Sequence, residues 1–143
     1  MFIGEYSYTI DNKRRLSIPS KFRATLGKKA VVTRWLESCL VLYPMKEWKE
    51  FTGKLEKLPG TQIDARGFSR ILLSGASDVN FDKLGRILIP DYLKEYAALK
   101  KNVTIIGLSN KIEIWDQESW NQYRKETEKE LGGIASKLKE LEV

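Results

Sequence analysis

Two short stretches of this sequence place an arginine four positions after an aspartate. Asp11 precedes Arg15 and Asp82 precedes Arg86, with the second pair 71 positions after the first. An aspartate that opens a tight loop can accept hydrogen bonds from backbone N–H groups two or three residues further on, which fixes the loop. Arginine suits two-pronged contact with phosphate or with guanine O6 and N7. The motif therefore combines a braced loop with a group that can hold a nucleic acid.

Residues 11–15 are called the first turn here, and residues 82–86 the second turn. The two turns carry basic side chains suited to contact a polyanion such as a nucleic acid, namely Lys13, Arg14, Arg15, Lys83 and Arg86. The expected braces of the loops are Asp11 and Asp82. Two poses stay open for each terminal arginine, because it can pair with the aspartate of its own turn or project outward to read DNA. The less basic surroundings of the second turn weaken the case for a contact there.

Both turns belong to an internal repeat. The segment 40–43 returns as 112–115, and Trp48 returns as Trp120, both at an offset of 72 in a chain of 143 residues. The sequence therefore consists of two copies of one unit, and whatever a turn does is done twice in each chain.

Alternating apolar residues predict a half-buried strand ahead of each turn, ending near Ile10 and near Phe81. The apolar pattern resumes after the turn, which predicts that the turn is the tip of a hairpin. A short helix should follow, with Ser20 or Asp91 as its N-cap and Gly27 as the end of the first one.

The rest of each copy is predicted to be two strands and a helix. The strands should cover residues 30–34, 39–43, 102–108 and 112–115, and helices should begin near Pro44 and near Asp116. These helices carry the aromatic pairs Trp48 with Phe51 and Trp120 with Tyr123, at a spacing more typical of core packing than of a ligand cage.

The expected fold class is α+β, with two tandem pseudo-symmetric β-β-α-β-β-α repeats in one compact unit. We assign residues 1–60 to the first repeat, 61–75 to a connecting helix and 76–143 to the second repeat with a helical tail. Thr61 and Asp64 resemble a capping box for the connecting helix, predicted over 62–74. Its apolar face should pack into the fold through Phe68, Ile71, Leu72 and Gly75.

The tail carries a heptad-like seam of Tyr123, Thr127, Leu131, Ile134, Leu138 and Leu141. Gly132 and Gly133 interrupt it, so the tail could be two helical pieces or partly frayed. The seam could face its own domain or a neighbouring subunit.

The formal net charge is +6, and it is unevenly distributed. Residues 1–71 hold 14 Lys and Arg against 7 Asp and Glu, whereas residues 72–143 hold 11 against 12. A dense basic segment suits a polyanion, although a solvated basic face without a partner would look the same.

Several function classes lack the residues that they need. The chain has no histidine, which removes the Ser-His and Cys-His nucleophiles and mixed Cys/His zinc sites and argues against an enzyme or a metal site. Its single cysteine, Cys39, lies among apolar residues and is expected to be a buried thiol. No apolar run has membrane-spanning length and the N-terminus lacks signal-peptide features, so we expect a cytoplasmic protein with no membrane partner.

The arrangement resembles the MraZ family, part of the wider group of AbrB-like swapped-hairpin DNA-binding domains. The resemblance rests on the two turns, the opening Met1–Tyr6, the Leu42-Tyr43-Pro44 corner with Trp48, and the stretch from Asp64-Ala65-Arg66 through Arg70 to Gly75-Ala76. It covers essentially the whole chain. Arg14 departs from the pattern, because a glycine is usual there and the second copy keeps Gly85.

The resemblance implies a swapped-hairpin barrel and a nucleoid-associated bacterial regulator of the division and cell-wall gene cluster. Such a regulator would bind double-stranded DNA at short direct repeats in the promoter of its own operon. It would assemble into ring-like homo-oligomers and use no cofactor or small-molecule substrate. An alternative is a ring-forming structural or protein-interaction module with a basic face. An antitoxin-like module is a further alternative, although one copy of the unit ordinarily suffices for that.

Overall fold

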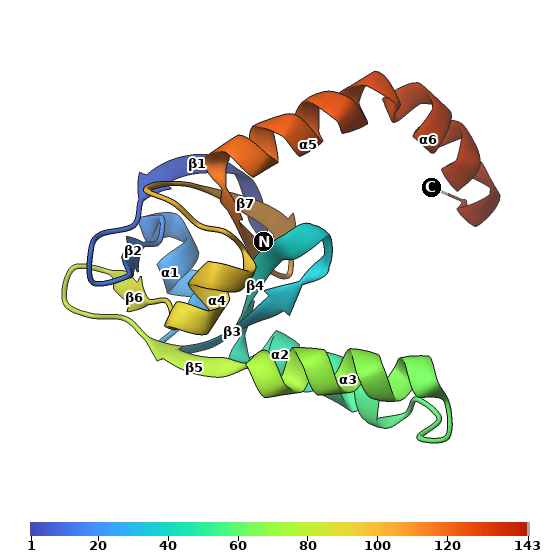
Figure 1. Ribbon diagram of the computed structural model, residues 1–143, viewed down its shortest axis with the longest axis horizontal. Coiled ribbons are helices and arrows are strands. Elements are labelled where there is room, and N and C mark those ends of the chain that lie inside the picture. The colour runs from blue at the N-terminus through green and yellow to red at the C-terminus, as the bar shows by residue number, and fades with distance from the viewer. Residues whose placement is uncertain (143) are drawn as a thin grey trace.

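The computed structural model describes residues 1–142 and confirms the order of elements predicted for each repeat (Figure 1). The first repeat consists of β1 (Phe2–Thr9), β2 (Arg15–Ser17), α1 (Ser20–Leu26), β3 (Lys29–Trp35), the 3-10 turn η1 (Leu36–Ser38), β4 (Cys39–Pro44) and α2 (Met45–Glu56). The second consists of β5 (Ser77–Asn80), β6 (Arg86–Leu88), α4 (Asp91–Tyr96), β7 (Asn102–Ser109), β8 (Ile112–Asp116) and α5 (Gln117–Lys129). Between them lies α3 (Ile63–Gly75), and at the end come α6 (Leu131–Leu138) and the 3-10 turn η2 (Lys139–Leu141).

The strands form one six-stranded antiparallel sheet in the order β1-β7-β8-β4-β3-β5 and a separate two-stranded sheet of β2 with β6. Four of these pairings cross between the repeats. Strand β1 pairs with β7, β4 with β8, β5 with β3, and β2 with β6. Neither repeat therefore completes its own sheet, and the two copies share one core.

This shared core explains the alternating apolar pattern around the turns. Leu16 and Ile18 come from the first repeat, Ile87 and Ile89 come from the second, and all four side chains are buried in the same cluster. Burying an aliphatic side chain of this size stabilises a fold by about 1.5–3 kcal/mol. These four buried residues attach the two-stranded sheet to the core, and the sheet in turn holds the two turns in place.

The prediction that each turn is a hairpin tip is only partly right, because the chain closes on itself beside the turn but the strands beyond it do not pair with each other. The strands that flank the first turn meet only at one isolated bridge between Ile10 and Leu16, and β2 takes β6 of the other repeat as its partner. Strand β2, which follows the first turn, is only three residues long. Its buried Leu16 lies opposite Ile87 of the other repeat, and both side chains belong to the same core cluster. Each turn is thus a loop between two strands that pair with different partners.

The predicted helix caps are partly wrong. Helices α1 and α4 have Pro19 and Pro90 at the N-cap, without any side-chain cap bond, and Ser20 and Asp91 are already helical. A proline fixes its own φ near the helical value, so it starts a helix without a capping side chain. Gly27 does end α1, with a φ of 73°.

The capping box predicted for α3 does not form, because its N-cap is Gln62 and no side chain caps the helix. The predicted apolar face is only half right. Leu72 and Gly75 are buried, whereas Phe68 and Ile71 are 37% and 53% exposed.

The aromatic pairs on α2 and α5 pack against aromatic residues of the sheet, as predicted, although Tyr123 remains 38% exposed. Phe51 stacks on Tyr43 with ring centroids 5.5 Å apart, and Trp120 meets Trp115 at 5.3 Å. The Cys39 thiol is fully buried, also as predicted, and burial raises its pKa strongly.

Helices α5 and α6 extend away from the sheets, and α6 bends back at the end of the chain (Figure 1). The break between them falls at Glu130, and α6 runs through both glycines. Leu131, Leu138 and Leu141 are exposed, so this part of the seam does not pack on its own domain.

Candidate nucleic-acid interface

The first turn is organised around the carboxylate of Asp11. Its Oδ1 accepts hydrogen bonds from the backbone N–H of Lys13 at 2.9 Å and of Arg15 at 2.8 Å. The backbone of Asp11 adds two bonds, since its N–H donates to the Arg15 carbonyl and its carbonyl accepts from the Arg14 N–H, each at 3.0 Å. The turn is thereby closed by four hydrogen bonds within five residues.

The second turn has the same design. Oδ1 of Asp82 accepts from the backbone N–H of Leu84 and of Arg86, both at 2.9 Å. The Asp82 N–H donates to the Arg86 carbonyl at 2.9 Å, and the Gly85 N–H donates to the Asp82 carbonyl at 3.1 Å. The Asp-x-x-x-Arg spacing therefore gives the same loop conformation in both repeats.

Each aspartate also pairs with the arginine of its own turn. The Nε of Arg15 donates to Oδ2 of Asp11 at 2.8 Å, and the Nε of Arg86 donates to Oδ2 of Asp82 at 2.8 Å. The backbone N–H of the arginine and its guanidinium together hold the pKa of each aspartate below its ordinary value, so both carboxylates are ionised at neutral pH.

This ion pair does not exclude a DNA contact, because it uses Nε and Oδ2 only. Of the two poses left open by the sequence, the structure shows the one in which each arginine pairs with the aspartate of its own turn. The side chain of Arg15 remains 36% exposed, and its terminal Nη groups make no hydrogen bond within residues 1–142. Arg86 is less open, at 24%, and its Nη1 also lies 3.8 Å from Oδ2 of Asp11.

The residue before the arginine differs between the turns. Arg14 has a φ of 62° and Gly85 a φ of 75°, so the first turn adopts the left-handed conformation without a glycine. The Arg14 Nε donates to the carbonyl of Ile89 at 3.1 Å, which ties this side chain to the other repeat. At Gly85 the space of a side chain is taken by the guanidinium of Arg23 from α1, and an added Cβ would collide with it.

The pairing of β2 with β6 places the two turns side by side. Arg15 lies opposite Leu88 and Ser17 lies opposite Arg86 in this small sheet. The backbone of the first turn is also hydrogen-bonded to the second repeat, since the Ile89 N–H donates to the carbonyl of Arg14 at 2.8 Å. Figure 1 shows both turns projecting at the same side of the molecule, at the left of the view.

The predicted contact residues therefore come together in one place. Lys13 and Lys83 are exposed on the two turns, while Arg14, Arg15 and Arg86 are half-buried beside them. The two loops share one plan, each with an ionised aspartate and an arginine, and together they form a single surface with positive side chains from both repeats.

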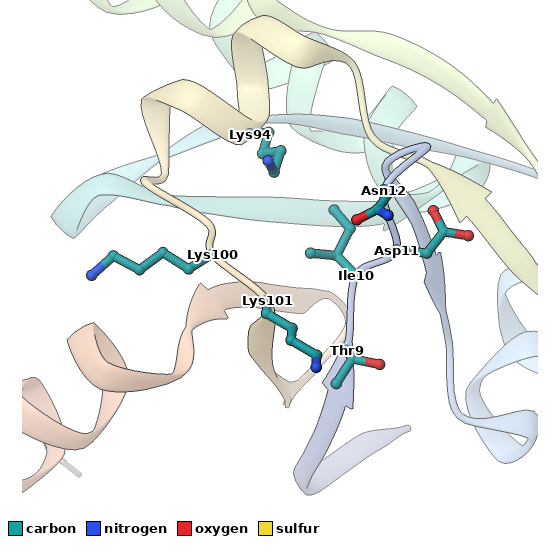
Figure 2. A pocket seen from close by; sticks show the side chains of 7 residues that line it. All are labelled: Thr9, Ile10, Asp11, Asn12, Lys94, Lys100 and Lys101. Atoms are coloured by element: carbon teal, nitrogen blue, oxygen red, sulfur yellow. The ribbon is translucent and has the colours of Figure 1, made fainter.

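A cleft of about 620 Å³ adjoins the first turn, and sequence reasoning missed it. It is lined by Thr9, Ile10, Asp11, Asn12, Lys94, Lys100 and Lys101. Figure 2 shows the lysines of the second repeat around the strand and turn of the first. The sequence held one sign of this site, because Lys94 lies 71 positions after Arg23 and so repeats a basic residue at the same place in the second copy. A count of charges made separately for each repeat misses the cleft, because the two repeats exchange strands and both contribute to it.

Within residues 1–142 no group of three or more Cys, Asp or Glu side chains is placed to hold a metal ion. Over the same residues, no helix combines the length and apolar character needed to cross a membrane.

The repeated unit, the exchanged strands and the paired basic turns define a class: a two-repeat α+β protein whose two copies share one core and bring their basic turns together. A family model described as "MraZ protein, putative antitoxin-like" matches residues 1–71 and again residues 72–139. The chain belongs to the MraZ family.

Several relatives share the full length of the chain. The protein named "Transcriptional regulator MraZ" of Natranaerobius thermophilus is 47% identical over 143 residues, and that of Moorella thermoacetica is 46% identical over 143, with both chains covered completely. The relative of the same name in Clostridium acetobutylicum is 48% identical over 141 residues, or 99% of each chain. These are the names of regulators and not of enzymes, and the chain is a member of a family of transcriptional regulators.

Proposed function

We propose that this protein is a sequence-specific regulator that binds double-stranded DNA through its two Asp-x-x-x-Arg turns. The observation that carries the proposal is the pairing of β2 with β6, which puts both turns on one surface. A composite of two short loops can enter the major groove, which is about 12 Å wide and displays the base edges that arginine reads.

The chemistry of the turns supports this assignment. Each aspartate is already saturated by the turn and its arginine, so its negative charge is compensated locally and repels a polyanion little. The Nη groups of Arg15 are directed at no other side chain within residues 1–142, which leaves a two-pronged donor for guanine or phosphate.

The target and the assembly follow from the family resemblance. The proposed sites are short direct repeats in the promoter of the protein's own operon, within the division and cell-wall gene cluster, and the protein would be nucleoid-associated. The proposed unit is an AbrB-like swapped-hairpin barrel that assembles into a ring-like homo-oligomer. A ring presents the same turns at regular spacing, and linking weak sites raises avidity by about 10²- to 10⁴-fold.

Binding to the protein's own upstream DNA tests the proposal. We expect a duplex from this region to bind more tightly than a scrambled duplex of the same length in a gel-shift titration at several salt concentrations. Both affinities should fall as salt rises, because counterions are released on binding, while the preference for the upstream duplex persists. Equal affinity for both duplexes at every salt concentration would favour the ring-forming interaction module instead.

A further inference from the structure

The cleft beside the first turn contains lysines that the proposed base-reading turns do not use. Lys94 is half-buried on α4, and Lys100 and Lys101 are exposed directly before β7. All three belong to the second repeat, yet they line a cleft whose other wall is Thr9, Ile10, Asp11 and Asn12 of the first.

The charges in this cleft are not cancelled by nearby acids. Asp11 lines the cleft, but both of its carboxylate oxygens are occupied within the turn, and Figure 2 shows the carboxylate directed away from the lysines. Lys100 extends away from the other two and reaches Glu118 at 3.5 Å. Both members of that pair are highly exposed, and such pairs contribute little. Lys94 and Lys101 pair with no acid within residues 1–142.

The second turn repeats the placement of one cation. Arg23 of α1 is the counterpart of Lys94 on α4, 71 positions earlier, and its guanidinium lies against Gly85. The Nε of Arg23 is buried without a hydrogen-bond partner within residues 1–142. Each turn is therefore accompanied by a cation from the first helix of the opposite repeat, and this arrangement recurs on both sides of the pseudo-symmetric unit.

We infer that the cleft lined by Lys94, Lys101 and Asn12 binds a backbone phosphate of the DNA whose bases face the first turn. The inference rests on the proposed function and adds a contact to the DNA backbone that does not depend on the base sequence. An ammonium group is a compact charge with three donors, suited to phosphate without demanding one geometry, and the Asn12 amide can donate to the same anion. The cleft shares Asp11 and Asn12 with the turn, so DNA seated on the turn brings its backbone to the cleft.

The test compares a full-length Lys94→Gln/Lys101→Gln variant with a Lys49→Gln/Lys54→Gln control. The control changes the net charge equally, at exposed positions on α2, away from the turns (Figure 1). Fluorescence anisotropy gives Kd for the upstream duplex and a scrambled duplex over a series of salt concentrations, and thermal melting checks that both variants fold.

We expect the cleft variant to weaken binding of both duplexes by the same factor. The slope of log K against log salt should become shallower by about 1, since the loss of one phosphate contact removes about 0.9. The ratio of the two affinities should stay at the wild-type value. A slope equal to that of the control variant would overturn the inference.

Two further outcomes distinguish this inference from a failure of the proposed function and from binding of a free anion. If wild-type protein binds both duplexes equally, the proposed sequence reading fails, while the slope of the cleft variant on either duplex still decides whether the cleft holds phosphate. If inorganic phosphate raises the melting temperature of the wild type and of the control but not of the cleft variant, while the salt slope of the cleft variant on DNA equals that of the control, the cleft is a site for a free anion. That combination would overturn its assignment to the DNA backbone.

Discussion

The two turns are built on one plan but are not equivalent. Both have an aspartate that closes the loop and an arginine held through Nε at 2.8 Å. In the first turn Arg15 is paired once, and Asp11 and Asn12 of that turn line an open cleft. In the second turn Arg86 lies near two carboxylates and Arg23 covers the adjacent glycine. The comparison indicates that the loop shape can be kept while exposure changes, so the first turn is the better placed to contact a ligand.

The largest effect expected from this difference is on DNA binding. Arg15→Ala should weaken specific binding by about 1–3 kcal/mol for each engaged subunit, because it removes a two-pronged donor. Arg86→Ala should cost less, since its guanidinium is more enclosed and is shared between two aspartates. Anisotropy titrations of both variants, alongside melting curves, measure the contrast. An Arg15→Ala protein that folds and binds its upstream duplex like the wild type would remove the first turn from the interface.

The next effect is on stability and concerns the second turn. Gly85→Ala should lower the free energy of unfolding by about 1–3 kcal/mol, because a Cβ is strained at positive φ and must also displace Arg23. Gly27→Ala is the matched control, since Gly27 has a φ of 73° but no atom near its missing side chain. Urea unfolding of both variants separates backbone strain from the collision. Equal losses in the two would mean that Arg23 moves aside freely.

A smaller effect is expected when the first turn is made like the second. Arg14→Gly relieves a left-handed residue, which is worth about 1 kcal/mol, but it also removes the bond from Arg14 to the Ile89 carbonyl, worth a similar amount. The free energy of unfolding from urea titration should therefore change by less than about 1 kcal/mol. A loss as large as that of Gly85→Ala would show that the crossing side chain holds the two repeats together.

The smallest difference is expected in pH dependence, where the turns should behave alike. Both aspartates have a pKa held below the ordinary 3.8, so the stabilisation by their hydrogen bonds is fully present above that value. It is lost only as pH falls through the lowered value of the folded state. The chain has no histidine, so turn structure should not change between about pH 5 and 8. The amide NMR signals of Arg15 and Arg86 report this, and a shift in only one turn near neutral pH would contradict the shared design.

Much of the fold could be predicted from local patterns. The apolar periodicity located the strands and helices, and the repeat paired the two turns, because both signals depend on residues close together in the chain. The prediction that Ser20 and Asp91 are N-caps was wrong by one residue. The N-caps are the preceding prolines, which start a helix without a side-chain hydrogen bond.

The strand exchange could not be read in the same way. The arms of a turn have the same apolar pattern whether β2 pairs with its own repeat or with β6, because both copies place buried residues at the same positions after the turn. For the same reason the charge count assigned the basic excess to the first repeat, although Lys94 and Lys101 of the second line a cleft at the first turn. The direction of the C-terminal seam was equally undetermined, since an apolar stripe does not specify what covers it.

The crossed pairing of β1 with β7 and of β5 with β3 has a consequence for how the chain can be divided. A fragment that ends before β5 would leave β1 and β2 without neighbours and would expose Leu16 and Ile18 to water. Two such halves, made separately, could regain the fold only by finding each other in solution, at a yield that falls on dilution. The covalent link supplies each half with its partner at a fixed effective concentration, so the unit folds independently of how much protein is present.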